Sequence, residues 1–427
     1  MKSLRVATLA VFCVLVLSLA ACGGGGDGGD EGAAPEGKTL GAADIENAKG
    51  NVTWCIGKDT SGAFKQMIDL HAQQNPDVKV ELLELPEAAD EQRTQQIQRL
   101  RAKSPECDVL GMDTIWTAEY ASQSWIYDLT DYVQDNQDRF IQSTLQSTQY
   151  QDKYWAVPFN SNAGFLYYRT DQVQQAPQTW QDAYQEAKAK DGLIYQGSSY
   201  EGLTVGFLEL LYSAGGTVLS DDGETVEIDS PETRDVLEFM RQGIQDGAVP
   251  RAVTTYKEQE SLRAFDAGRA TFMRQWPYGY ALSQEAPAVK GKFAVTPLPK
   301  WQGGEPAGVL GGYNLGIAAS SDAPEAALEF IDFVTQAEPQ KIMASKAALP
   351  AVLAETYDDP AVKKALPFAT ELREAIEHAG VRPVSPVYPQ INEAIHTNVY
   401  SVLQGRATPD AAAKEMKSDI EQALKTF

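Results

Sequence analysis

Two short segments place aromatic residues beside glycine, proline and single polar residues. Trp276-Pro277-Tyr278 follows a probable strand, and Gly311-Gly312-Tyr313-Asn314 interrupts another strand with a double glycine. Glycine inside a strand often marks a close approach to the backbone, here expected to come from a ligand. Aromatic faces pack against the C–H groups of a pyranose ring while polar groups bond its hydroxyls, so these segments favour binding of a neutral, hydroxyl-rich molecule. For any single aromatic residue, a place in the core is the commoner alternative.

Motifs for the common kinds of enzyme are missing from the sequence. It has no Gly-x-x-x-x-Gly-Lys loop, no Cys-x-x-Cys pair, no His-Glu-x-x-His and no Gly-x-Ser-x-Gly. Its three histidines offer little material for a metal site, and His71, on an apolar helical face, suits a structural role. We expect no catalytic residue, no metal and no cofactor. A secreted glycosidase stays open because it needs only two carboxylates, and the chain has 59 acidic residues.

The N-terminus has the features of an export signal. Lys2 and Arg5 precede an uncharged run over residues 6–21 that is short for a membrane span. The run ends in Leu19-Ala20-Ala21-Cys22, which resembles the lipobox of bacterial lipoproteins and implies acylation of Cys22. An ordinary signal peptide is the alternative. Glycines and acidic residues follow, and such a segment predicts a flexible tether.

The size and charge of the remaining chain restrict its domain number and its possible partners. Its roughly 380 residues exceed what one hydrophobic core usually serves, so we expect two domains. A formal charge of −23 argues against nucleic acid and against electrostatic attachment to anionic lipid. Export permits a disulfide between Cys55 and Cys107, but both lie in apparent core strands, and we favour two buried thiols.

The first half of the globular part alternates strands with helices. We expect strands over 52–56, 78–83 and 108–112, with helices near 64–71 and over 88–103. This order predicts a parallel sheet with helices on both faces. Ligands bind beyond the carboxyl ends of such strands, which is where Asp113 stands.

Further along, the pattern changes. Strands are expected over 154–159 and 164–169, and the short polar break between them, 160–163, looks like a crossing between two lobes. Helices are expected over 180–190, 200–214 and 231–245, strands over 293–296 and 309–318, and mostly helix over the last hundred or so residues.

Seven short strings of the sequence matter together. They are Glu91-Gln92-Arg93, Gly111-Met112-Asp113-Thr114-Ile115-Trp116, Asn162-Ala163-Gly164-Phe165-Leu166-Tyr167-Tyr168-Arg169, Tyr200-Glu201-Gly202-Leu203, Trp276-Pro277-Tyr278, Leu310-Gly311-Gly312-Tyr313, and Arg382-Pro383 with Tyr388-Pro389-Gln390. In their order and spacing, the chain resembles the trehalose/maltose-binding proteins of ATP-driven importers, within the large group of extracellular solute-binding proteins. The similarity extends from about residue 51 to the C-terminus.

The resemblance implies an α/β, two-lobed fold of the periplasmic-binding-protein type II, with a mostly parallel, helix-flanked sheet in each lobe and the ligand cleft between lobes. We expect a signal peptide over 1–21 and a lipidated tether over 22–50. Lobe 1 is expected over 51–159 plus 297–348, and lobe 2 over 160–296 plus 349–427.

The resemblance also implies site residues. Arg93 and Asp113 bond sugar hydroxyls from the first lobe, Trp276 stacks under a glucose ring, Gly312 and Tyr313 line the cleft, and Arg382 enters from the second lobe. Asn162 joins this set, and Asp59, Glu201 and Tyr388 are weaker candidates.

Some of these positions have other interpretations. Arg93 also suits a solvated helix face, Arg382 a surface or capping role, and Glu201 a helix start favoured by the dipole. Two positions depart from the family pattern, because family members carry an acidic residue in place of Asn162 and tryptophan in place of Tyr313. Both changes are compatible with a sugar ligand, but they leave the identity of the disaccharide open.

The function implied is that of a monomeric, exported and lipid-anchored substrate-binding component of an ABC-type importer. It binds an α-linked glucose disaccharide, trehalose or a maltose-like sugar, and passes it to the membrane permease without chemistry on it. Besides the glycosidase, a binding protein for another small solute, such as a peptide, is the alternative.

Overall fold

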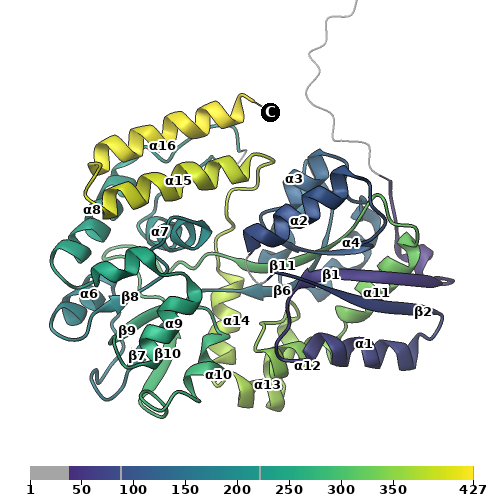
Figure 1. Ribbon diagram of the computed structural model, residues 1–427, viewed down its shortest axis with the longest axis horizontal. Helices are drawn as coiled ribbons and strands as arrows, with labels where there is room; N and C mark the ends of the chain where they lie inside the picture. The colour runs from purple at the N-terminus through teal and green to yellow at the C-terminus, as the bar shows by residue number, and fades with distance from the viewer. Residues whose placement is uncertain (1–37, 87–88, 221–222, 427) are drawn as a thin grey trace, which may run out of the picture. The chain divides into compact units, whose positions relative to one another are not determined.

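The computed structural model describes residues 38–86, 89–220 and 223–426, so the expected signal peptide, Cys22 and most of the tether lie outside the described part. Its larger sheet has the strand order β2-β1-β3-β11-β6 (Figure 1). These strands are β1 (Gly50–Gly57), β2 (Val78–Leu85), β3 (Val109–Asp113), β6 (Val157–Asn162) and β11 (Gly311–Ile317).

A smaller sheet has the order β10-β7-β9-β8. Its strands are β7 (Phe165–Arg169), β8 (Leu193–Ile194), β9 (Phe272–Gln275) and β10 (Phe293–Pro297), and a separate two-stranded ladder joins β4 (Gln149–Tyr150) to β5 (Lys153–Tyr154).

Both sheets are mostly parallel, as expected, and each contains one reversed strand. In the larger sheet β2, β1, β3 and β6 run in one direction, and β11 runs antiparallel to its neighbours β3 and β6. In the smaller sheet β8, β9 and β10 run in one direction, and β7 runs antiparallel to its neighbours β9 and β10. The crossings explain the reversal of β11: β6 ends where the chain passes to β7, and β11 begins where the chain returns from β10, so these two strands must run in opposite directions.

The crossing itself is shorter than expected. Asn160, Ser161 and Asn162 belong to β6, and only Ala163 and Gly164 separate this strand from β7. These polar residues belong to the strand because their backbone pairs with β11. Pairing of backbone N–H and C=O groups, rather than apolar side chains, is what a strand requires.

Helices surround both sheets. In chain order they are α1 (Ala63–Gln74), α2 (Ala89–Arg101), α3 (Thr117–Ser122), α4 (Thr130–Asn136), α5 (Gln142–Gln146), α6 (Trp180–Lys188), α7 (Glu201–Ser213), α8 (Pro231–Gln245), α9 (Glu258–Asp266), α10 (Gly279–Ser283), α11 (Pro324–Val334), α12 (Ala337–Ile342), α13 (Pro360–Ala365), α14 (Ala369–Glu377), α15 (Tyr388–Leu403) and α16 (Pro409–Leu424). Short turns of other helical types are η1 (Ala42–Ile45), η2 (Gln137–Arg139), η3 (Arg251–Thr255), η4 (Met343–Ala347) and η5 (Ala354–Asp358).

The larger sheet is covered on both faces, as the buried apolar residues of its inner strands β1 and β3 require. Trp54 packs with Phe64 of α1 in one buried cluster, whereas its neighbour Cys55 packs with Ile97 of α2 in another. Successive side chains of a strand point to opposite faces, so α1 and α2 lie on opposite sides of the sheet (Figure 1).

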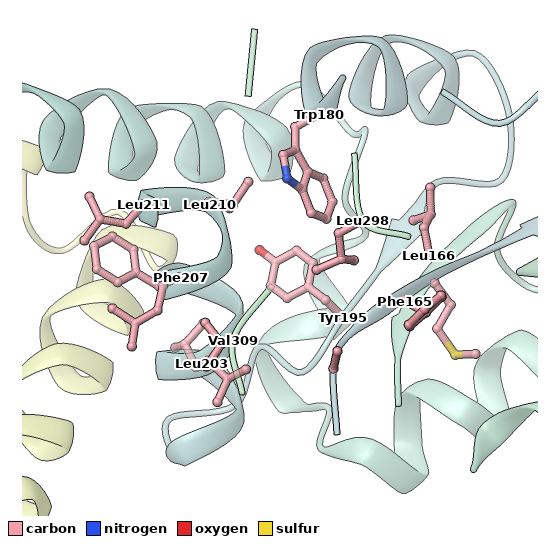
Figure 2. Close-up of a cluster of buried hydrophobic side chains, with 14 of the residues drawn as sticks. Phe165, Leu166, Trp180, Tyr195, Leu203, Phe207, Leu210, Leu211, Leu298 and Val309 are labelled. Carbon is pink, nitrogen blue, oxygen red and sulfur yellow. The ribbon is translucent and has the colours of Figure 1, made fainter. Parts of the chain in front are cut away.

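The core of the second sheet fixes α7. Figure 2 shows side chains of this helix, among them Leu203, Phe207 and Leu211, in one cluster with Trp180 of α6 and Tyr195. Val309, which precedes β11, lies in the same cluster. The first residue of α7, Glu201, and the start of β11 are therefore held by one apolar core, which buries each Leu or Phe with a gain of roughly 1.5–3 kcal/mol.

Cys55 and Cys107 form a disulfide, so the expectation of two buried thiols is wrong. Their Cα atoms are 5.7 Å apart, within the range that a bridge requires. Cys107 precedes β3, which pairs with β1, and this pairing brings the two residues together across 52 positions of sequence.

Removing the bridge should lower the free energy of unfolding. Closing a loop of this length restricts the unfolded chain, and the stabilisation is about 2–4 kcal/mol. We expect the pair Cys55→Ala and Cys107→Ala to shift the urea midpoint downward accordingly. Thiol titration of the unfolded parent provides the control: two free thiols without reductant, or an unchanged midpoint, would contradict the bridge.

Candidate functional site

Strand register brings several of the expected site residues together. Asp113, the last residue of β3, pairs with Tyr313, and Asn162, the last residue of β6, pairs with Gly311. Directly opposite residues of an antiparallel pair point to the same face, with Cβ atoms roughly 5 Å apart. The ends of β3 and β6 and the start of β11 thus form one edge, on the side where the chain crosses to the smaller sheet.

Arg382 occupies this edge between two carboxylates. Its Nη2 donates to Asp113 Oδ1 at 2.8 Å and to Thr114 Oγ1 at 2.7 Å, and its Nη1 donates to Glu201 Oε1 at 2.8 Å. Tyr388 Oη donates to the same Glu201 oxygen at 2.6 Å. The Arg382 side chain is only 3% exposed. One buried cation therefore joins a strand end of the larger sheet to the first residue of α7.

Backbone pairing explains how Arg382 reaches that position. Gly380 forms a parallel bridge with Val309, and its N–H donates to the Gly308 carbonyl at 2.9 Å. A Cβ at position 380 would lie 2.9 Å from the Tyr212 ring, so glycine permits the approach. The segment before Arg382 is therefore fastened to the segment that leads into β11.

Several buried polar atoms at this edge have no hydrogen-bond partner among the described residues. They include Glu201 Oε2, Arg382 Nε and Asn162 Oδ1. Burial raises the pKa of Glu201, while the charge of Arg382 opposes the shift. Unpartnered buried polar atoms are costly, roughly 1–3 kcal/mol each, and are rare unless a ligand or water bonds them.

Trp276 lies beside Asn162 at this edge. It directly follows β9, and a Cβ built on Gly311 would lie 3.2 Å from Trp276 Cη2 and 3.3 Å from Asn162 Cβ. Glycine at 311 thus makes room for the indole, which is half-buried. The arrangement offers an aromatic surface next to an amide that can both donate and accept.

The double glycine has a structural cause at its second position. Gly312 has φ +116°, and a Cβ there would lie 2.2 Å from the carbonyl oxygen of Asn160 in β6. Its own carbonyl accepts from Thr114 N at 3.2 Å. The close approach that the sequence suggested is therefore made by a neighbouring strand.

Arg93 lies across a cavity of about 240 Å³ from the charged cluster. Its guanidinium is bidentate to Glu119, with Nε donating to Oε2 at 2.8 Å and Nη2 to Oε1 at 2.6 Å. Arg93 is thus paired rather than solvated, and 26% of its side chain is exposed. The cavity is lined by Asp90, Arg93, Ile115, Trp116, Glu201, Tyr388, Pro389, Asn392, Glu393 and His396.

Sequence reasoning missed several of these lining residues. Asn392 and His396 stand four and eight positions after Tyr388 on α15, so helical spacing places all three on one face. This helical spacing can be read from the sequence. Glu119 and Thr114, in contrast, are recognised only through their partners Arg93 and Arg382, which are distant in sequence.

Asp59 is not joined to the cluster by the contacts of the described chain. Its carboxylate accepts from Ser61 N, Ser61 Oγ and Phe64 N at the start of α1, which is a capping role. His71 bonds Glu329 at 2.8 Å and packs against Phe330 and Phe333, in agreement with a structural role. Within 38–86, 89–220 and 223–426, no cluster of three His, Cys, Asp or Glu is arranged for a metal, and no helix is suited to span a membrane.

Loss of Arg382 should destabilise the fold strongly. Arg382→Met leaves Asp113 and Glu201 buried without their cation, and breaking a buried ion pair in this way costs roughly 3–5 kcal/mol. The matched control is Arg93→Met, which breaks a more exposed pair and should cost about 1 kcal/mol or less. Urea unfolding of both variants measures the difference. Equal losses in the free energy of unfolding would show that the Arg382 cluster stabilises the fold no more than the exposed Arg93 pair does.

Comparison with known proteins bears on the whole fold. The model of the bacterial extracellular solute-binding protein family matches residues 57–341. A Deinococcus radiodurans protein named a probable ABC transporter-binding protein is 32% identical over 362 residues, which are 80% of this chain and 86% of that one. A maltotriose-binding protein of Pyrococcus abyssi is 24% identical over 379 residues, 85% of this chain and 77% of the relative.

Solved structures also show similarity to solute-binding proteins. The structure described as maltose-bound T. maritima MalE3 is 33% identical to this chain, has a TM-score of 0.80, and the match covers 88% of this chain and 100% of that one. The two-lobed type II architecture and the resemblance to maltose-binding proteins are thereby confirmed. The chain is an exported solute-binding protein rather than a glycosidase, and it belongs to the bacterial extracellular solute-binding protein family.

Proposed function

We propose that this chain binds an α-linked glucose disaccharide, maltose-like or trehalose, and delivers it to the permease of an ABC importer. The observation that carries the proposal is the set of buried atoms Glu201 Oε2, Arg382 Nε and Asn162 Oδ1, which have no partner among the described residues, together with the half-buried ring of Trp276 near Asn162. Sugar hydroxyls both donate and accept, so one neutral ligand can satisfy the two acceptors and the donor.

Charge at the site disfavours an anionic ligand. Arg382 lies between two carboxylates, Asp113 and Glu201, so this cluster has a formal net charge of −1, whereas Arg93 and Glu119 balance each other. An anionic ligand would add a further negative charge to a largely buried site, which costs far more than burying hydroxyls that can donate to the carboxylates. Hydrogen bonds from hydroxyls to these ions contribute roughly 1.5–3 kcal/mol each.

The glucose disaccharide is supported by the relatives and by the aromatic surface. Two of the similar proteins have a name or description that mentions maltose or maltotriose. Trp276 and Tyr313 stand at either end of the Gly311-Gly312-Tyr313 segment, which spans roughly 7 Å from its first to its third residue in strand geometry. Two sugar rings side by side suit such spaced surfaces.

Transport then follows from hinge closure around the ligand. A ligand favours the closed form only by contacts that it makes better there. Both parts of the molecule contribute residues to the site. Asp113 and Asn162 end strands of the larger sheet. Glu201 and Trp276 belong to the part built on the smaller sheet. We expect a monomer in which a sugar bridges these two groups.

Binding without chemistry is the expected result in calorimetry. Titration of the mature domain with maltose and with trehalose should give saturable heats for at least one sugar, with a dissociation constant near 1 μM, equivalent to about −8.2 kcal/mol. Chromatography of the sugars after long incubation should show no glucose. Absence of heat with both sugars would refute the disaccharide, and glucose release proportional to protein would refute pure binding.

We further propose that a lipid on Cys22 holds the exported protein at the outer face of the cytoplasmic membrane. Two or more acyl chains give durable attachment, at about 0.8 kcal/mol per buried methylene. Cys22→Ser should therefore move the protein from the membrane fraction to the soluble exported fraction. Cys55→Ala is the matched control and should stay with the membrane. A Cys22→Ser protein as tightly membrane-bound as the parent would disprove the anchor.

A further inference from the structure

A second buried ion pair lies directly behind Trp276. Arg274, in β9, places its guanidinium carbon 4.0 Å from the centroid of the Trp276 ring. The side chain of Arg274 is 2% exposed and that of its partner Glu209, in α7, is 1% exposed. An arginine over an aromatic face is a cation–π contact, strongest where water is excluded.

Every nitrogen of this guanidinium has a partner. Nε donates to Glu209 Oε2 at 2.9 Å, Nη2 donates to Glu209 Oε1, and Nη1 donates to Gln196 Oε1 at 3.1 Å. Gln196 is itself bonded to Ser261 and to the Arg274 carbonyl. These bonds lie along the edge of the planar group, so its orientation is fixed and a flat face remains for the indole.

Stability alone does not account for such a pair. Replacing a buried ion pair by well-packed apolar residues is often neutral or stabilising, because desolvation offsets the Coulomb attraction. Burial raises the pKa of Glu209, while Arg274 opposes that shift, so the pair bears a real desolvation cost. What the pair supplies is a rigid surface at a defined place.

The remaining contacts of Trp276 fix its backbone. Its carbonyl accepts from Tyr167 Oη at 2.8 Å, and its N–H donates to Gln275 Oε1 at 2.9 Å. Gly311 approaches the far end of the ring. Two side-chain torsions then decide how the indole faces the cleft, and Arg274 contacts its face.

We propose that Arg274 is a positioning residue, which holds the Trp276 ring in the orientation that stacks on a sugar. The proposal rests on the sugar-binding function proposed above. Arg274 itself does not touch the ligand; it acts through the indole, while Glu209 and Gln196 hold the guanidinium. The planar face is the essential property, so lysine cannot replace it even though lysine keeps the charge opposite Glu209.

The test is a double-mutant cycle with maltose as the probe. Arg274→Lys should weaken maltose binding roughly three- to thirtyfold, the range of a desolvated cation–π contact. In a Trp276→Ala background the same substitution should have almost no further effect. Arg169→Lys is the matched control, because Arg169 is also buried and bidentate to Asp171, but at the other end of β7; it should bind maltose as the parent does. Equal losses from Arg274→Lys in both backgrounds would overturn the proposal.

A ligand-free readout separates this proposal from the sugar assignment. Near-ultraviolet circular dichroism of the parent minus that of Trp276→Ala isolates the band of this indole. Arg274→Lys should reduce that band, and Arg169→Lys should leave it unchanged. A parent without any heat for maltose would end the sugar assignment only. An unaltered Trp276 band in Arg274→Lys would end the positioning role, whatever the ligand.

Discussion

A buried guanidinium must be paired, and this requirement organises the cleft around Arg382. Removal from water costs several kcal/mol per ion, so Arg382 holds Asp113 and Glu201 at fixed places. Asp113 ends a strand of the larger sheet, and Glu201 begins a helix anchored in the core of the smaller one. Any relative movement of these two elements must stretch, exchange or rebuild the bonds of one arginine. The cluster therefore couples hinge motion to whatever bonds its spare atoms.

The strands supply the other half of the site, and their directions follow from the crossings. Because β6 leaves for the smaller sheet and β11 returns from it, the end of one lies beside the start of the other. Asn162 and Gly311 meet there, and Trp276 follows β9 on the far side of the crossing. Glycine at 311 and 312 lets an indole and a neighbouring backbone approach to distances that a Cβ would prevent.

Local patterns in the sequence predict much of this arrangement. The strand–helix alternation, the strand end at Asp113 and the helix start at Pro231 are local properties, and the structure has them within a few residues. Three other features depend on residues far apart in sequence: the disulfide, the Arg93–Glu119 pair and the antiparallel pairing of β11. The periodicity of hydrophobic residues does not encode such contacts. The resemblance to a family named Arg382, Asp113, Glu201 and Trp276, but it did not name Glu209 and Gln196, which hold Arg274.

The two buried arginines differ in a way that separates their roles. Each of the three nitrogens of Arg274 has a partner in Glu209 or Gln196, and none of the described side-chain atoms of these three residues is buried without a partner, so this network is closed in that sense. Within the part of the chain that the structure describes, Arg382 and Glu201 each retain a buried atom without a partner. A closed network keeps its geometry when the cleft fills, which suits the support of a stacking surface. An open network gains bonds when hydroxyls arrive, and only such a gain can make a ligand favour one conformation over another. Rigid support on one side and unsatisfied charge on the other are thus complementary requirements of a site that must both recognise a sugar and close on it.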